Sequence, residues 1–298
     1  MQRKLLTAVG IASISLILIA AISNTPLTHA IVVAPTIPSQ MNLAGEKVPM
    51  NEFGVREALD REFIVNTYHH SSTILHLKKS SRWFPIIEPI LEEEGIPDDF
   101  KYLCVIESGL SQVVSPAGAA GFWQFMKKTA PEYDLEVSST VDERYHVEKS
   151  TRAACQYLKE SYEVFGSWSL AAASYNMGMG GVSKSLDEQG VEDYWDLHLN
   201  SETARYVYRI LAVKEVMTNP ERFGFKLRPN DLYKPYTFRT VTVDKSIDDL
   251  SEFALSNGSN LHEMKVLNPW LRKKNLLVGE GQTYNIYFPN TFHMEVKS

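Results

Sequence analysis

Apolar residues recur every three or four positions over most of this 298-residue chain, and this spacing constrains the fold more than any other feature. Val55, Leu59 and Phe63 are each four apart, and the run FPIIEPILEEEG (residues 84–95) ends in Gly95, a residue type that commonly stops a helix. This is the period of an α-helix with one buried face. The chain up to about residue 222 is therefore predicted to be mainly α-helical.

Three further helices are expected in this part of the chain. One covers residues 98–107, because Pro97 suits a first helical turn and the two aspartates after it suit the positive end of the helix dipole. The others cover residues 150–165 and 202–217, whose apolar residues share one helical face.

The C-terminal part of the chain has a different pattern. Residues 237–244 (TFRTVTVD) and 283–289 (TYNIYFP) alternate as strands do. Between them, SIDD (246–249) and NLHE (260–263) each resemble a capping box at the start of a helix. Strand, helix, helix, strand predicts a small α+β domain at residues 237–298.

Prolines mark two connections between these parts. Pro35, Pro38 and Pro49 predict a linker over residues 31–50, and RPNDLYKPY predicts another. The expected organisation is 1–30 as a signal peptide or membrane anchor, 31–80 as a linker and N-terminal helical extension, 81–222 as the main helical domain, 223–236 as a linker and 237–298 as the small domain.

The N-terminus predicts export. MQRK is a basic start, residues 5–22 are a long apolar run, and THA, ending at Ala30, is a small-residue cleavage site. We favour cleavage, but the run is as long as the roughly 17–20 residues that span a bilayer, so a membrane anchor through residues 5–22 is the alternative. The expected location is the periplasm or cell envelope.

Net charge and the numbers of cysteine and histidine residues disfavour nucleic-acid-binding proteins and metalloenzymes. A net charge of −6 opposes binding to nucleic acid. Cys104 and Cys155 lie among apolar residues, so two buried thiols are favoured over a disulfide, and two cysteines cannot form a multi-cysteine zinc site. His69, His70 and His76 cluster without HExxH spacing and are interpreted as helix surface or core. No metal or cofactor is expected.

The stretch CVIESGL (104–110) sets Glu107 into an apolar helical run. Leu103 lies one turn before it, and Ile106 and Leu110 are neighbours on that side. Glu107 is thus predicted at the edge of a buried face, where partial desolvation raises the pKa of a carboxyl. A raised pKa suits a general acid. Most glutamates at such a boundary, however, have a structural role.

A second stretch, SPAGAAGFWQFM (115–126), has the composition of a sugar-binding loop. Its small residues allow close approach of a ligand to the backbone. Gln124 offers an amide, and Trp123 or Phe122 offers a flat face. The alternative is a glycine-rich turn that leads into a buried aromatic helix.

Two later stretches also combine small residues with polar and aromatic ones. AAASYNMGMGG (171–181) presents Tyr175 and Asn176, for which the alternative is a buried tyrosine whose hydroxyl is satisfied. SETARYVYRI (201–210) places Glu202, Tyr206 and Arg209 at i, i+4 and i+7. These could face a cleft, and the alternative is a solvated helix face.

In this order, IESGLSQVVSPAGAAGFWQFM, AAASYNMG and ETARYV resemble the three signature blocks of the family 1 lytic transglycosylases. These enzymes have a goose-type lysozyme (SLT) fold and cut peptidoglycan. The resemblance covers about residues 80–220, is close to the membrane-bound lytic murein transglycosylase D subgroup, and extends to VDERYHVEKSTRAACQYL (141–158). It implies a mainly α fold: a lysozyme-like catalytic domain followed by a small α+β (βααβ) LysM-like domain.

The LysM resemblance lies in VLNPWLRKKNLLVGEGQTYNIYFP, whereas VDKSIDDL replaces the usual glycine-containing turn. LysM modules bind peptidoglycan and chitin-like glycans, so glycan binding is favoured. The alternative is a packing domain that has lost this binding.

The resemblance also implies roles for individual residues. Glu107 would be the single catalytic acid/base. The residues that would bind substrate or shape the site are Ser108, Ser115, Gln124, Met126, Tyr175, Asn176, Glu202 and Tyr206, with Tyr175 and Asn176 positioning the Glu107 carboxyl and the N-acetylmuramic acid ring. The loop between Glu107 and Gly121 is one residue shorter than in many relatives and lacks the proline that usually follows the serine pair. Phe122 replaces a usual Leu or Ile.

The expected function is non-hydrolytic cleavage of the bond from N-acetylmuramic acid to N-acetylglucosamine, giving 1,6-anhydromuramic ends. The partners are peptidoglycan glycan strands, and a monomer is expected. One alternative is a goose-type muramidase, whose second carboxylate would be Asp134, Asp142 or Glu143. The other is a catalytically inactive peptidoglycan-binding protein.

Overall fold

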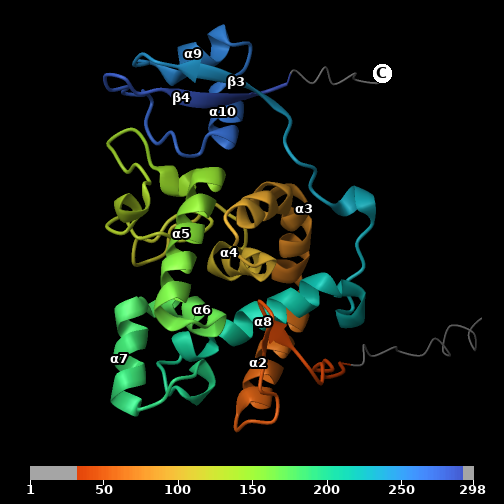
Figure 1. The fold of residues 1–298 in the computed structure, drawn as a ribbon. Helices are drawn as coiled ribbons and strands as arrows, with labels where there is room; N and C mark the ends of the chain where they lie inside the picture. Colours follow the sequence, from red (N-terminus) through yellow and green to blue (C-terminus); the bar gives the residue numbers. More distant parts are fainter. Residues whose placement is uncertain (1–31, 291–298) are drawn as a thin grey trace, which may run out of the picture. The chain divides into compact units, whose positions relative to one another are not determined.

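A computed structural model describes residues 32–290 (Figure 1), and the chain from Pro35 onward belongs to one compact unit. The predicted signal peptide or anchor lies outside the described residues. Among residues 32–290, no helix combines the length and the apolar character needed to cross a membrane.

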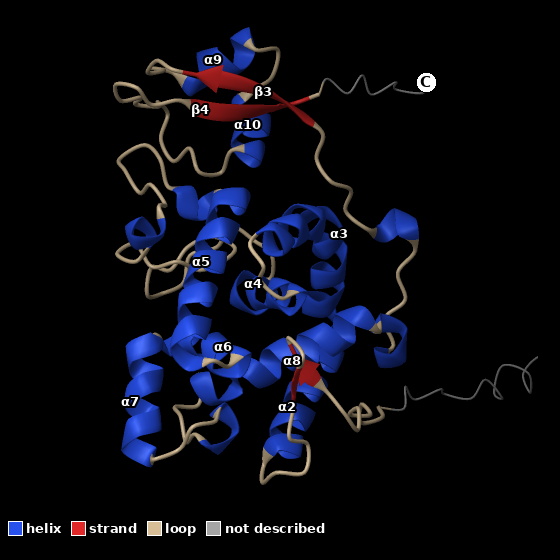
Figure 2. Ribbon diagram, in the orientation of Figure 1, coloured by secondary structure: helices blue, strands red, loops and turns tan. Residues whose placement is uncertain are grey.

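The described chain is mainly helical, as predicted (Figure 2). Its α-helices are α2 (Val55–Tyr68), α3 (His70–Glu93), α4 (Lys101–Ser108), α5 (Val147–Phe165), α6 (Trp168–Met177), α7 (Met179–Gln189), α8 (Tyr206–Thr218), α9 (Leu250–Ser256) and α10 (Leu261–Leu267). Its strands are β1 (Asn42–Leu43), β2 (Glu46–Lys47), β3 (Phe238–Val243) and β4 (Tyr284–Pro289).

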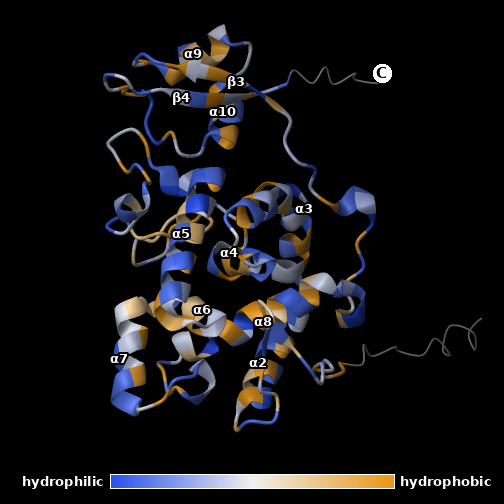
Figure 3. Ribbon diagram, in the orientation of Figure 1, coloured by the Kyte–Doolittle hydropathy of each residue, from blue (hydrophilic) through white to orange (hydrophobic). Residues whose placement is uncertain are grey.

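Helix α3 is longer than the helix expected at residues 84–95, because it starts at His70 and runs through Pro85 and Pro89. It ends before Gly95, whose φ of +69° is the left-handed conformation that glycine favours. The helix expected at 98–107 divides into a 3₁₀ turn and α4, which Gly109 ends at φ +58°. Each of these helices carries both hydrophobic and hydrophilic residues (Figure 3), as amphipathic helices do.

Two segments predicted as linkers contribute to the main core. Strands β1 and β2 form a hairpin inside residues 31–50, and Leu43 is fully buried. In the second linker, Phe223 and Phe225 are also buried in this core. Prolines indicate that regular structure is interrupted, but they do not prevent the neighbouring apolar side chains from being buried.

The hairpin also fixes the start of α6. The Glu46 carboxylate accepts hydrogen bonds from the backbone N–H groups of Trp168 and Ser169 and from both serine hydroxyls there, with Ser167 as N-cap. An acid at this end opposes the positive pole of the helix dipole.

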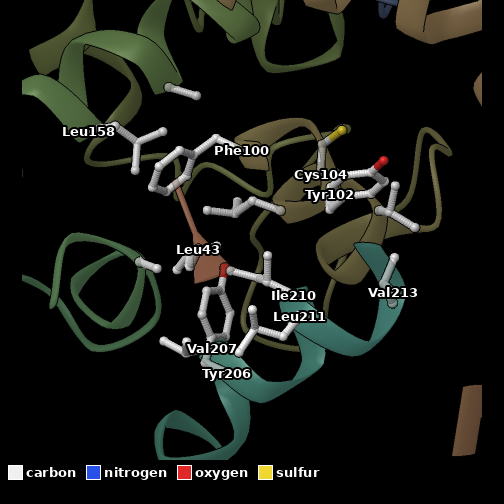
Figure 4. Packing of buried hydrophobic residues seen from close by; sticks show 14 of the residues in the cluster. Leu43, Phe100, Tyr102, Cys104, Leu158, Tyr206, Val207, Ile210, Leu211 and Val213 are labelled. Carbon is white, nitrogen blue, oxygen red and sulfur yellow. The ribbon is translucent and has the colours of Figure 1, made fainter. Parts of the chain in front are cut away.

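The main core surrounds α4, which packs on α3 and α8. Figure 4 shows Tyr206 and Val207 of α8 near Leu43, with Phe100 and Cys104 in the same cluster. The thiols of Cys104 and Cys155 are free and buried, as favoured from the sequence.

The C-terminal segment has the predicted order of β3, α9, α10 and β4, with β3 and β4 antiparallel from Phe238↔Pro289 to Val243↔Tyr284. Asn260 caps α10 as predicted, accepting from the Glu263 N–H at 2.9 Å. The capping box at SIDD was wrong. Asp249 is the N-cap of α9, whereas the Ser246 hydroxyl accepts from Val278 N–H instead.

This small segment packs against the loop before α5. The Asp142 N–H donates to the Trp270 carbonyl and the Arg272 N–H donates to the Thr140 carbonyl, each at 2.9 Å. The Tyr284 hydroxyl donates to Glu136 at 2.7 Å. The contact is thus built from backbone and side-chain hydrogen bonds as well as apolar burial.

Candidate functional site

Glu107 lies in the last turn of α4 and keeps part of its surface exposed. The hydroxyl of Tyr206, at the start of α8, donates a hydrogen bond to Glu107 Oε1. Tyr206 is only 1% exposed, so this hydroxyl reaches the carboxyl from inside the core. One turn further along α8, Arg209 Nη2 donates to the carbonyl of Ile106 at 2.8 Å.

These surroundings set the acidity of Glu107. Burial raises the pKa of its carboxyl, while the Tyr206 hydroxyl and the positive charge of Arg209 lower it and the negative charge of Glu202 raises it. Within residues 32–290 no Lys, Arg or His forms an ion pair with Glu107. A carboxyl of this kind can hold a proton and also release it. The predicted direction of the pKa change is confirmed.

The loop at residues 115–126 is tightly folded beside Arg144. Gly121 has φ +80°, and a Cβ there would lie 1.9 Å from the Arg144 carbonyl oxygen, so only glycine fits. Gln124 has a positive φ of +50°, and its Nε2 donates to the Gly121 carbonyl at 2.7 Å and the Val113 carbonyl at 3.2 Å. Met126 is 43% exposed. The loop therefore commits the Gln124 amide nitrogen to its own backbone and leaves Met126 accessible.

The prediction that Trp123 or Phe122 offers a flat face to a sugar was wrong. Both rings are buried: Trp123 donates through Nε1 to Thr151 Oγ1 at 2.9 Å, and Phe122 packs edge-on against Trp83. In this respect the alternative, a turn that leads into buried aromatic residues, was correct. Here the buried rings of Phe122 and Trp123 fix the loop to the core.

The two predicted serines bind nearby backbone. Ser108 Oγ donates to the Cys104 carbonyl at 3.0 Å, one turn back in α4. Ser115 Oγ accepts from the Ala119 N–H at 3.1 Å and so closes the turn of the loop. The Ser108 hydroxyl thus bonds to the helix that carries Glu107, and the Ser115 hydroxyl stabilises the loop.

A polar network joins the second and third blocks. Asn176 accepts from Thr203 Oγ1 at 2.7 Å and donates to the exposed Glu202 carboxylate at 3.3 Å. Tyr175 donates to the Trp123 carbonyl at 2.9 Å, and burial together with the charge of Glu107 raises the pKa of its hydroxyl well above the usual value. Thr203, inside ETARYV, was missed from the sequence, although its place between Glu202 and Tyr206 could have indicated it.

The three carboxylates considered for a muramidase have other surroundings. Asp142 is paired with Arg144 through two hydrogen bonds of 2.8 and 2.9 Å, and Glu143 is paired with Lys149. Asp134 is exposed, in a left-handed turn. None of them is among the groups whose charge shifts the pKa of Glu107.

The histidine cluster has the surroundings expected of helix surface and core. His69 and His70 are exposed, and burial lowers the pKa of the half-buried His76 to about 4. Among the described residues, no group of three or more His, Cys, Asp or Glu side chains is arranged to hold a metal ion.

A hollow lies between α3, the start of α5 and the C-terminal segment. Its lining includes the aromatic rings of Trp83, His146, Trp270 and Tyr287. The Trp270 Nε1 is buried and has no hydrogen-bond partner among residues 32–290. The site residues assigned by resemblance do not line it.

Comparison with known proteins gives these features a family context. Residues 85–198 match the model of the transglycosylase SLT domain. The chain carries an SLT domain. Residues 239–291 match the C-terminal LysM-like domain of soluble lytic transglycosylases. The predicted resemblance and the predicted fold class, an SLT domain followed by a small LysM-like domain, are confirmed.

The relatives are similar over part of their length. The chain is 29% identical over 235 residues to membrane-bound lytic murein transglycosylase D of Escherichia coli K12 and of E. coli O6:H1, which is 77% of this chain and 50% of each relative. It thus spans about half the length of these curated relatives. An X-ray structure of an inactive mutant of lytic transglycosylase Slt from Pseudomonas aeruginosa gives a TM-score of 0.39 at 21% identity, covering 51% of this chain and 26% of that one.

Proposed function

We propose that this chain is a peptidoglycan lytic transglycosylase in which Glu107 is the single general acid and base. One observation supports this most strongly: Glu107 is a largely buried carboxyl that faces the neutral hydroxyl of Tyr206 and has no ion-pair partner among the described residues. Ordinary glycoside hydrolysis uses two carboxylates. A transglycosylase that uses a hydroxyl of its own substrate as nucleophile needs only one.

In the first step, protonated Glu107 donates its proton to the oxygen of the bond between N-acetylmuramic acid and N-acetylglucosamine. The C1–O bond breaks, and N-acetylglucosamine leaves with the proton. The N-acetyl group of the muramic sugar stabilises the positive charge that develops at C1. The raised pKa of Glu107 favours this step, because it keeps the proton available near neutral pH.

In the second step, the Glu107 carboxylate accepts the proton of the C6 hydroxyl, whose oxygen then bonds to C1. The product is a 1,6-anhydromuramic end, and Glu107 is again protonated. No water is consumed. The Tyr206 hydroxyl and the charge of Arg209 both stabilise the carboxylate between the two steps, since both lower the Glu107 pKa.

The other predicted residues have proposed roles around this carboxyl. Met126 and Glu202 are accessible and would contact the sugar. Asn176 would act through its bonds to Glu202 and Thr203. The remaining residues, Ser108, Ser115, Gln124 and Tyr175, would hold the backbone that shapes the site.

The rest of the chain is assigned with the same proposal. Residues 1–30 would direct export to the periplasm or cell envelope, with residues 5–22 as an anchor if they are retained. We keep the division into a catalytic domain at 81–222 and a LysM-like domain at 237–298, with the hairpin of residues 41–48 added to the catalytic core. The LysM-like domain would bind glycan strands, and the protein would act as a monomer.

The test is to digest purified peptidoglycan with residues 31–298 and with Glu107→Gln, and to identify the products by mass spectrometry. Anhydromuropeptides from the first protein and none from the second support the proposal. Reducing, water-added products would instead identify a muramidase. Glycan binding without any product would identify a binding protein.

A further inference from the structure

Arg209 joins two helices at the site. It lies on α8, but its Nη2 donates to the carbonyl of Ile106, the residue before Glu107, at 2.8 Å. This carbonyl belongs to the last turn of α4, where carbonyls lack partners within the helix. A cation at this end also opposes the negative pole of the helix dipole. Arg209 therefore holds the turn that carries Glu107.

A second cation holds the same helix end from another side. Lys79 of α3 donates through Nζ to the Gly109 carbonyl at 3.0 Å, and His76 lies so close that a Cβ on Gly109 would be 2.9 Å from its Nε2. Neither group is among those that shift the Glu107 pKa. Lys79 is thus a helix cap, whereas Arg209 both caps the helix and acts on the carboxyl.

The charged and titratable groups that face Glu107 come from several elements. Tyr206 and Arg209 belong to α8, Glu202 precedes it, Tyr175 comes from α6, and Cys104 lies one turn earlier in α4. Within this set Arg209 is the cation, so the carboxylate form of Glu107 depends on it for positive charge.

We propose that Arg209 is a positioning residue for Glu107: its guanidinium fixes the last turn of α4 through Ile106 and supplies positive charge to the carboxylate that exists between proton donation and proton return. This inference rests on the proposed function. A planar guanidinium can bond to a carbonyl with one nitrogen while its delocalised charge faces the carboxyl, and an ammonium cannot do both equally well.

Three variants separate charge from geometry. Arg209→Gln and Arg209→Met remove the charge, the second while keeping an aliphatic stem, and Arg209→Lys keeps the charge without the planar fork. Arg222→Gln is the matched control, because Arg222 follows the same helix but pairs with Glu215 at 3.0 Å.

Each protein is measured in two ways. Carbon-13 NMR follows the titration of the Glu107 carboxyl, identified by its loss in Glu107→Gln. The pH dependence of kcat/KM for anhydromuropeptide release from purified peptidoglycan follows the reaction. Thermal unfolding checks that each variant is folded.

Removing the charge is expected to move the Glu107 midpoint, and the alkaline limb of kcat/KM, to higher pH. Arg209→Lys is expected to keep the midpoint and lose on the order of tenfold in kcat with little change in KM, because the carboxyl is misplaced. Arg222→Gln should match the unmodified protein in the Glu107 midpoint and in the pH profile of kcat/KM.

An unmoved Glu107 midpoint in both uncharged variants overturns the electrostatic part of the proposal. Unchanged kcat in Arg209→Lys overturns the positioning part, and it does so even if the uncharged variants fail to fold. If the unmodified protein forms no anhydro product, the proposed function fails, but the NMR titration still decides whether Arg209 acts on Glu107.

Discussion

Glu107, which is largely buried, and Glu143, which is fully buried, are two carboxyl groups of the SLT domain with opposite surroundings. Glu143 is 3% exposed, is paired directly with Lys149 and accepts the Glu136 N–H at 2.9 Å. Beside it, Asp142 is paired with Arg144. Glu107 instead accepts from a neutral hydroxyl, and the cation near it donates to the backbone.

This difference separates a carboxylate that maintains structure from one that can exchange a proton. A direct cation keeps a buried carboxylate charged, and removing either partner is costly because the other is left uncompensated. A hydroxyl can donate to a carboxylate and can equally accept from a carboxylic acid. Burial alone therefore does not identify the functional carboxyl, whereas the kind of partner does.

The largest expected effects come from removing the two charges separately. Glu107→Gln should lower the rate of anhydromuropeptide release by about 10²–10⁴-fold, the range for general acid–base catalysis, with unchanged or higher stability. Glu143→Gln should keep most activity and lose about 1–3 kcal/mol of unfolding free energy, because a buried hydrogen-bonded charge is lost. Product release assays and urea unfolding of both variants measure this.

The two assignments would be reversed if Glu143→Gln were inactive but fully stable while Glu107→Gln stayed active. Circular dichroism of both variants confirms that they fold.

The next prediction concerns the stability of the loop at residues 115–126. The Arg144 guanidinium pairs with Asp142 and donates to the Gly118 and Phe125 carbonyls at 2.9 and 3.1 Å. Arg144→Met removes the cation that pairs with the buried Asp142 carboxylate and the side-chain donor to the Gly118 carbonyl. Because the carboxylate is then left without its cation, the change should cost about 3–5 kcal/mol of unfolding free energy. Denaturant unfolding measures this, with exposed Lys184→Met as control. Equal stability of the two variants would show that Arg144 is dispensable to the loop.

Much of this architecture was predictable because it depends on local pattern. The helical period up to residue 222 and the alternation in β3 and β4 are set by burial of one face, which leaves a direct record in the sequence. The edge position of Glu107 in its helix is of the same kind. The prediction failed where distant segments meet. Nothing local indicated that Glu46 caps α6, nor that the hairpin enters the core.

The site shows the same limit. Spacing placed Tyr206 and Arg209 near one face of a helix, but their targets lie on α4, about a hundred positions earlier, at Glu107 and Ile106. Trp123 was mistaken for a sugar platform, because a ring that anchors a turn and a ring that faces a ligand have the same composition around them. Only the packing distinguishes the two.

A smaller effect is expected from acid at the junction with the LysM-like domain. His146 stacks on Trp270, and burial lowers its pKa from 6.5 to about 4. Between these values the unfolded state binds a proton that the folded state does not, so stability is full above pH 6.5 and falls as the pH falls toward 4. His76 contributes in the same direction.

Protonation of His146 should lower the unfolding free energy by about 1–2 kcal/mol between pH 7 and pH 4.5. This is less than the full linkage value, because the ring is partly exposed. Urea unfolding at pH 7 and pH 4.5 measures it, and His146→Gln should show a smaller loss than the unmodified protein. An identical loss in both would place the acid sensitivity elsewhere. Low pH thus has two opposite effects: it protonates Glu107, which catalysis requires, and it weakens the junction at His146.

The smallest effect is expected from Tyr206→Phe, which removes the hydroxyl group that donates to Glu107. Tyr206→Phe keeps the buried ring and removes the hydroxyl that stabilises the carboxylate, so the Glu107 pKa should rise and the alkaline limb of kcat/KM should move to higher pH. Loss of one hydrogen bond to a charged group is expected to lower kcat by about tenfold, since proton return needs the carboxylate. The pH profile of anhydromuropeptide release measures both, with Tyr208→Phe on the same helix as control. If the alkaline limb and kcat are both unchanged, Tyr206 acts by packing alone, and the contrast between a hydroxyl partner at Glu107 and a cationic partner at Glu143 loses its chemical meaning.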